Sequence, residues 1–215
     1  WQTDPPPGRA LVEIGGGIRL PLYVSGPASH SWWAMVALLL VAAALFLSFV
    51  FSYFYIWIVS PEVWPRAGGD GLPDVRWPLA GAATFVAASA GLWLTKLSLS
   101  RSARWGQWPL RFLLVLVAML LAAALALELR GHWQSGLRPG DSSYAALVYA
   151  SIVIEGQLIA AAVVMGLFTL ARSLAGKLDH ERRVVLDNTA LFSHFAVAQG
   201  LISLLLLHGF PRLAA

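Results

Sequence analysis

Few residues of this 215-residue chain combine a chemically active side chain with an apolar setting. Glu155 stands in the stretch SIVIEGQLIAA, and His194 stands in ALFSHFAVAQG. A charge at membrane depth costs at least ~2.5–3.5 kcal/mol, so an ionisable residue there is a candidate functional group by default. The sequence therefore predicts an intramembrane polar site, or a lipid-binding cleft, drawn from Glu155, Gln157, His194 and Gln199.

The depths of these residues limit which of them can meet. At a rise of 1.5 Å per residue, His194 is expected about 12 Å from Glu155 along the helix axes. That separation is too large for a direct hydrogen bond. Gln199 or Gln157 is therefore the expected partner of Glu155. We expect Glu155 to face the last apolar stretch or an interhelical cleft, because the small residues Ala162 and Gly166 share its helical face.

Several interpretations of these polar groups stay open. The simplest is that Glu155 holds two helices together. A place in a proton path, or contact with a lipid headgroup or a water-filled cleft, are the alternatives. For His194 the simplest interpretation is a bond to a neighbouring carbonyl. His208 lies near the end of the last apolar stretch, and we expect it at the membrane interface.

Other catalytic arrangements are missing from the sequence. The absence of cysteine excludes disulfides, thiolate metal sites and thiol nucleophiles. No P-loop, His-Glu-x-x-His or Ser–His–Asp pattern is recognisable, and the run Gly15–Gly16–Gly17 indicates a turn or linker. Because only His194 is expected well inside an apolar stretch, we predict no haem, metal or other cofactor site and no catalytic residue in this chain. It is expected to serve a catalytic partner.

The composition indicates which elements position these residues. Hydrophobic residues make up 58% and charged residues 12%, with a mean hydropathy of +0.69. Soluble domains carry about 25% charged residues. A soluble domain is therefore excluded. The net charge of +4 is better explained by Lys and Arg that anchor cytoplasmic loops than by nucleic-acid binding.

Five apolar stretches are long enough to cross the membrane as helices, which takes about 20 residues each. The sequence therefore predicts an all-α, polytopic bundle of five transmembrane helices. No pattern of short alternating segments suggests a β-barrel. The expected spans are residues 32–59, 77–97, 108–129, 144–170 and 189–210.

The distribution of Lys and Arg predicts the orientation of the bundle. Ten of these residues fall before the first span or near the second and fourth loops, and five fall in the other loops or after the last span. The positive-inside rule then places the N-terminus in the cytoplasm and the C-terminus outside. Of the 15 basic residues, the ten are Arg9, Arg19, Lys96, Arg101, Arg104, Arg111, Arg172, Lys177, Arg182 and Arg183.

The first 31 residues differ from the rest. They open with WQTDPPPGRA and are predicted to form a Pro/Gly-rich cytoplasmic linker and an interfacial lead-in. Residues 32–215 form the predicted transmembrane domain. A chain that starts at Trp1 is expected to have lost residues or to be the C-terminal part of a longer polypeptide.

Three segments resemble subunit III of haem-copper cytochrome c oxidases. Residues 26–65 (GPASHSWWAMVALLLVAAALFLSFVFSYFYIWIVSPEVWP) resemble the family's third helix and the Pro/Trp-containing loop after it. Residues 84–110 (TFVAASAGLWLTKLSLSRSARWGQWPL) resemble its next helix and basic turn. Residues 187–211 resemble its terminal helix, where His194–Phe195 match part of a Trp-His-Phe segment. The likeness extends over about residues 27–212.

The resemblance implies a non-catalytic subunit that packs on subunit I, beside subunit II, in the bacterial inner membrane. It implies bound phospholipid and support for proton uptake and stability of a complex that reduces oxygen with electrons from cytochrome c. Haem and copper would then lie in the partner subunits. The start without Met and the five spans resemble the III-like tail of a fused subunit I and III.

Two positions depart from the family pattern. Ala43 stands where the family usually carries a Glu, and Glu155-Gly156-Gln157-Leu158 stands where it carries His-Gly-x-His.

Two further functions remain open from the sequence. One is a small membrane transporter or assembly factor whose own polar path is lined by Glu155, Gln157, Gln199 and His194. The other is a III-like subunit of a nitric oxide reductase.

Overall fold

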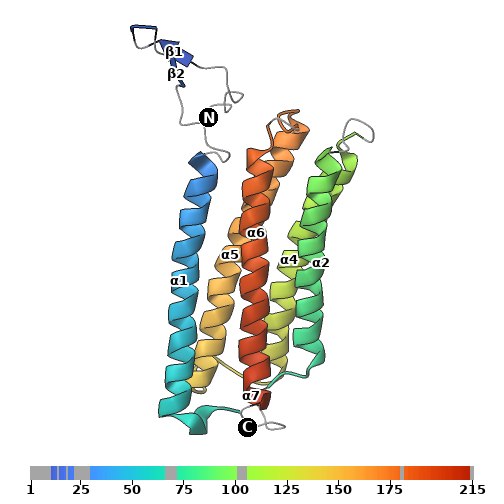
Figure 1. The fold of residues 1–215 in the computed structure, drawn as a ribbon. Coiled ribbons are helices and arrows are strands. Elements are labelled where there is room, and N and C mark those ends of the chain that lie inside the picture. The colour runs from blue at the N-terminus through green and yellow to red at the C-terminus, as the bar shows by residue number, and fades with distance from the viewer. Residues whose placement is uncertain are drawn as a thin grey trace.

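The computed structural model describes residues 11–13, 15–17, 19–21, 30–65, 72–100, 106–179 and 182–213. Five long helices dominate it (Figure 1). All five are long and apolar enough to cross a membrane, so the predicted all-α bundle of five transmembrane helices is confirmed. The helices are α1 (His30–Val59), α2 (Arg76–Ser100), α4 (Trp108–Gln134), α5 (Ser143–Leu174) and α6 (Val184–Leu204).

The five helices run alternately up and down the bundle (Figure 1). The start of α1 lies at one end, together with the end of α2, the start of α4, the end of α5 and the start of α6. The short helix α7 (Phe210–Leu213), which follows α6, lies at the opposite end with the connection from α4 to α5. The side of the membrane that each end faces stays a prediction.

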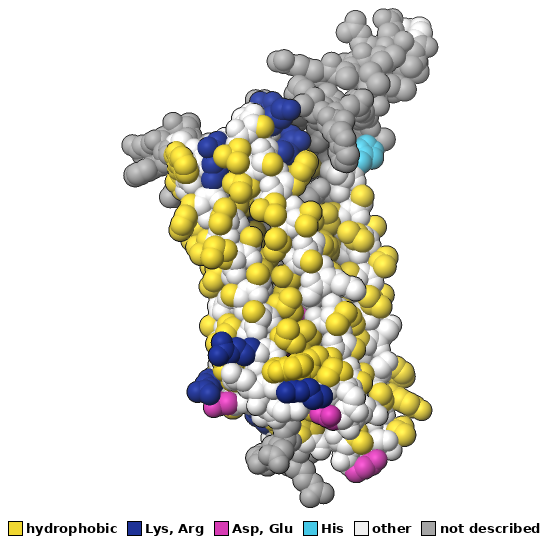
Figure 2. All heavy atoms as spheres, turned by 180° about the vertical axis from the view of Figure 1, so that it is seen from behind, with side chains coloured by type: hydrophobic (Ala, Val, Ile, Leu, Met, Phe, Trp, Pro, Cys, Tyr) yellow, Lys and Arg dark blue, Asp and Glu magenta, His cyan; other side chains and the backbone are white. Residues whose placement is uncertain are grey.

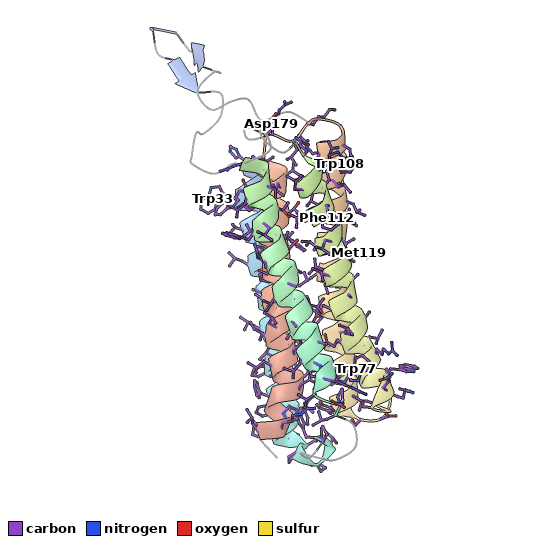
Figure 3. All side chains as sticks on the ribbon, turned by 90° about the vertical axis from the view of Figure 1, so that its right-hand side faces the viewer. Trp33, Trp77, Trp108, Phe112, Met119 and Asp179 are labelled. Carbon is purple, nitrogen blue, oxygen red and sulfur yellow. The ribbon has the colours of Figure 1, made fainter. Side chains whose placement is uncertain are left out.

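Apolar side chains cover the middle of the bundle, and basic side chains gather toward its two ends (Figure 2). The outward-facing Phe112 and Met119 of α4 are each 66% exposed (Figure 3). Trp33 and Trp108 lie near one end of the bundle and Trp77 near the other. This distribution is typical of a lipid-facing surface with an aromatic belt at each interface.

A small hairpin precedes the bundle. Strand β1 (Leu11–Glu13) pairs antiparallel with β2 (Arg19–Pro21), and Leu11 lies opposite Pro21. Gly15, Gly16 and Gly17 all have positive φ, a conformation that glycine adopts without steric cost. The glycine run therefore lies in the turn of a hairpin. Residues 1–10, 14, 18 and 22–29 of the predicted linker fall outside the described residues.

Helix α6 is central and α1 is peripheral. Of the residues in the most apolar part of the last span, 61% are buried inside the bundle. The corresponding share for α1 is 17%. Close packing of α2 on α6 depends on Gly200, where an added Cβ would lie 2.7 Å from Cζ of Phe85. The absence of a side chain at Gly200 thus lets the Phe85 ring fill the interface between the two helices.

Candidate functional site

Helix α4 places two ionisable side chains on its inner face. Glu128 and His132 are four residues apart, so they lie one above the other on the same face. Leu121 and Ala124 continue that face toward the middle of the helix, and all four residues are at most 2% exposed. Arg130 and Trp133 point outward instead and keep the opposite face in contact with lipid or water. The helix therefore positions an acid and an imidazole inside the bundle.

The end of α4 packs tightly because of a glycine. An added Cβ at Gly131 would lie 2.9 Å from Cβ of Trp77, at the start of α2. The Arg130 guanidinium lies 5.4 Å from the centre of the Trp77 ring, on the outer side of this contact. Trp77 appears at this end of the bundle in Figure 3. The close approach encloses the turn of α4 that carries His132.

Helix α5 brings a second acid to the same place. Glu155 is fully buried. It lies on the inner face of α5, together with the buried residues Ser151, Ile159 and Ala162. The Glu155 carboxyl lies close enough to the carboxyl of Glu128 for the two groups to influence each other electrostatically. Two carboxyl groups that meet in an apolar interior need a shared proton or a cation between them, because like charges repel strongly there. Glu155 therefore belongs to a site shared by α4 and α5.

His208 comes from a π-helical turn, η2 (Leu205–Gly209), that follows α6. It is 5% exposed, and its ring stacks on that of His132 with centroids 4.8 Å apart and planes 25° apart. π-Turns within helices are rare and frequent at functional sites. Here the π-turn joins the end of the last span to the inner face of α4.

The sequence explains why the π-turn forms and what holds it. The N–H of Phe210 bonds Leu205 O, and Pro211 has no N–H to offer, so the carbonyls of Leu206 and Leu207 lack their usual helical donors. The Tyr53 hydroxyl donates to Leu206 O and the Tyr144 hydroxyl to Leu207 O, both at 3.2 Å. Two buried tyrosines from α1 and α5 thus fix the turn that carries His208.

A basic side chain closes this end of the bundle. Arg212 donates to the carbonyl oxygens of His208 and Pro73, each at 2.6 Å. The bonds tie α7 to the segment that precedes α2. Because the guanidinium is partly exposed, it keeps contact with the surroundings while its donors bind backbone oxygens.

The four side chains share an unusual property. All eight of their carboxylate oxygens and ring nitrogens are buried, and none has a hydrogen-bond partner among the described residues. A ligand atom from each of Glu128, His132 and His208 lies within 4.8 Å of the others. Buried polar groups are almost always hydrogen-bonded, so four unpartnered ones at a single place need an explanation. We refer to Glu128, His132, Glu155 and His208 as the Glu–His cluster.

The structure confirms part of the expectation for Glu155 and corrects the rest. Glu155 faces the interior and not lipid, on the same face as Ala162 and Gly166, as predicted. Its predicted amide partner is wrong. Gln157 is exposed on the opposite face of α5, and the buried amide of Gln199 makes no hydrogen bond among the described residues. The neighbour of Glu155 is an acid on α4.

His194 lies apart from the cluster. Its Nδ1 is 2.9 Å from the Ser89 hydroxyl on α2, and the side chain is half-buried. The expected hydrogen-bond partner of His194 was a backbone carbonyl, and the observed partner is a serine hydroxyl. This contact joins α6 to α2, consistent with a structural role for His194.

Three cluster residues were not expected from the sequence. His208 was expected near the membrane interface, and its burial inside the bundle was not expected; His132 is enclosed in the same way. Glu128 was missed because the third span was predicted to end at Leu129, whereas α4 continues to Gln134. The four-residue spacing of Glu128 and His132 on one helix was the available signal.

Comparison of the sequence with models of known protein families gave no match, and a search of curated proteins gave no significant match.

Proposed function

We propose that this multi-pass membrane chain is a non-catalytic subunit III, or III-like domain, of a respiratory haem-copper cytochrome c oxidase in a bacterial inner membrane. It would pack on subunit I, either as a separate chain or as part of the same polypeptide, and beside subunit II. Cytochrome c would donate electrons to the whole complex, and haem and copper would lie in the partner subunits. The chain would bind phospholipid and support proton uptake and stability of the oxygen-reducing, proton-pumping complex.

The observation that carries the proposal is the position of the three segments that resemble the family. They form α1 with the turn after it, α2, and α6, so the likeness extends across one bundle and is not confined to one helix. Two of these helices pack directly, through the bond between Ser89 and His194 and the contact between Phe85 and Gly200.

The surface of α1 suits a subunit of a larger membrane complex. Its exposed residues are large and apolar, and they cover most of its length. Within a membrane such a face contacts either lipid tails or another membrane subunit. The most exposed of them are Leu40, Val41, Leu47, Phe51 and Ile58.

Purification under mild detergent tests the proposal. Full-length protein is purified through a histidine-free affinity tag from the organism's own membranes, and its visible absorption spectrum and co-purifying proteins are recorded. We expect a membrane partner that carries haem, with the haem lost when that partner is separated. Isolation of the chain without a haem-bearing partner, or stoichiometric haem bound by the chain alone, would overturn the proposal. A haem-bearing partner that reduces nitric oxide and not oxygen would assign the chain to a nitric oxide reductase.

A transporter with its own polar path is the alternative that the buried polar groups favour. The Ser151 and Ser203 hydroxyls lie 3.1 Å apart, and Ser203 stands between Gln199 and His208 along the last span. Solute or proton flux into liposomes that contain only this chain, lost in Glu155→Gln, would support this alternative against the oxidase proposal.

A further inference from the structure

We propose that the Glu–His cluster is a binding site for one divalent transition-metal ion of the zinc class. Glu128, His132 and His208 supply the three ligands that already converge, and Glu155 supplies a fourth. The inference goes beyond the proposed oxidase role and does not rest on it, since it concerns only side chains of this chain.

The geometry is close to that of a metal site. Ligand atoms of Glu128, His132 and His208 lie within 4.8 Å of one another. Zn–N and Zn–O bonds of about 2.0–2.1 Å in a tetrahedral site place ligand atoms about 3.3 Å apart. An ion bound here would draw the three ligand atoms about 1.5 Å closer together than they lie without it. Glu128 and His132, one turn apart on α4, hold the spacing from which two ligands on one helix commonly reach a single ion.

Burial argues for an occupant. The four side chains are between 0% and 5% exposed, and their eight polar atoms make no hydrogen bond among the described residues. Leaving a buried polar atom without a partner is unfavourable. A single cation would coordinate one atom of each side chain. The ion would thus satisfy four groups that the described part of the chain leaves without partners.

The charges of the site balance around a divalent ion. Two ionised carboxylates, Glu128 and Glu155, would neutralise the charge of the ion, and the two imidazoles bind metal in their neutral form. Arg212 is a basic side chain close enough to both histidines to act on them electrostatically. Its guanidinium is partly exposed and donates to the carbonyls of His208 and Pro73, which leaves the ring nitrogens of both histidines free for an ion.

The donor types select the class of ion. Two imidazole nitrogens with carboxylate oxygens suit zinc and its neighbours in the first transition series. Magnesium and calcium prefer sites made of oxygen atoms alone. Copper(I) prefers sulfur ligands, and this chain has no cysteine. Zn²⁺ is therefore the probe to use first, with Co²⁺ as its coloured substitute.

The surroundings hold the ligands in place. Tyr53 and Tyr144 bind the carbonyls of the π-turn, which sets the position of His208. The Gly131–Trp77 contact encloses the turn that carries His132. Metal sites depend on such outer contacts to orient their ligands. Ligands from α4, α5 and the π-turn thus meet near one end of the bundle.

Metal binding to the full-length chain in detergent tests the proposal. Protein with a histidine-free tag is stripped with a chelator and titrated with Zn²⁺ in competition with a chromophoric chelator. We expect one equivalent of tightly bound zinc. His132→Gln, His208→Gln and Glu128→Gln should each weaken binding at least tenfold, and Glu155→Gln should weaken it less. His194→Gln is the matched control, because this half-buried histidine lies outside the cluster, and the variant should bind zinc like the unaltered protein.

Either of two results of the zinc titration would overturn the proposal. One is unaltered protein that binds no tight equivalent of zinc, and the other is cluster variants that bind zinc as the His194→Gln control does. The unaltered protein also gives a readout that needs no variant, in case the variants fail to fold. Loading with Co²⁺ should produce visible absorption bands typical of nitrogen-ligated cobalt, displaced by Zn²⁺. Absence of these bands would contradict the assignment.

Discussion

His132 and His208 stack their rings 4.8 Å apart although they come from different helices of the bundle. The first belongs to the end of α4 and the second to the π-turn after α6. Their contact brings the last span onto the α4–α5 pair that carries Glu128 and Glu155. Changes to the π-turn should therefore act on the cluster, even where the altered residue touches none of its ligand atoms.

Pro211→Ala should disturb the cluster from outside it. Alanine restores an N–H that can bond Leu207 O, so the π-turn can return to an α-helix and rotate His208 away from His132. We expect weaker zinc binding, measured by the same competition titration, with unchanged helix content by circular dichroism. Pro109→Ala in the first turn of α4 is the control, since a proline there removes no helical hydrogen bond. Equal effects of both changes would refute the role of the π-turn.

Tyr53→Phe and Tyr144→Phe should each lower stability. Each removes a hydroxyl that donates to a buried carbonyl of the π-turn. Hydrogen bonds between transmembrane helices average about 0.6 kcal/mol and reach ~1.7 kcal/mol, so we expect a loss within this range. Thermal unfolding in detergent measures it. Tyr55→Phe is the control, because Tyr55 is 57% exposed and faces away from the bundle; a loss as large in this variant would contradict the account.

The contact between α2 and α6 should not tolerate a side chain at position 200. Gly200→Val would push β-branched atoms into the ring of Phe85, whose Cζ would already lie 2.7 Å from an added Cβ. Overpacking typically costs about 1–3 kcal/mol. Lower thermal stability is therefore expected in Gly200→Ala and more so in Gly200→Val. Phe85→Leu should rescue part of the loss in Gly200→Ala. Additive effects of the two changes would show that the residues do not share this contact.

Glu155 offers a test of the acid pair. Glu155→Gln keeps the size of the side chain and can donate a hydrogen bond to Glu128, so assembly and stability should change little. Glu155→Leu leaves the buried Glu128 without its polar neighbour, which should cost roughly 1–3 kcal/mol. The double variant Glu128→Leu with Glu155→Leu should recover stability, since replacing both members of a buried polar pair is often neutral. No recovery would mean that the two acids are not coupled.

The fold followed from the sequence because transmembrane helices have a strong signal. A run of about 20 apolar residues has few alternatives in a membrane, and the five predicted spans match the five helices within a few residues at most ends. The third and fifth spans extend further than predicted, because α4 continues past Leu129 to Gln134 and α6 begins at Val184.

The sequence predicted the Glu–His cluster less well than the fold, for physical reasons. Hydropathy counts residues one at a time, so it ended the third span close to Glu128 and assigned His208 to the interface. The enclosure of both depends on contacts between helices: Gly131 against Trp77, and the tyrosines that hold the π-turn. The predicted partner of Glu155 failed for the same reason, since the estimate considered α6 and not α4.

X-ray absorption at the zinc edge of the Zn²⁺-loaded full-length protein tests the central claim most directly, that the Glu–His cluster is one metal site. The account predicts scattering from about two imidazole rings, together with oxygen neighbours, at about 2.0–2.1 Å. His208→Gln should remove the scattering of one ring, and His194→Gln should leave the spectrum unchanged. A first shell of oxygen atoms alone, without imidazole scattering, would contradict the account.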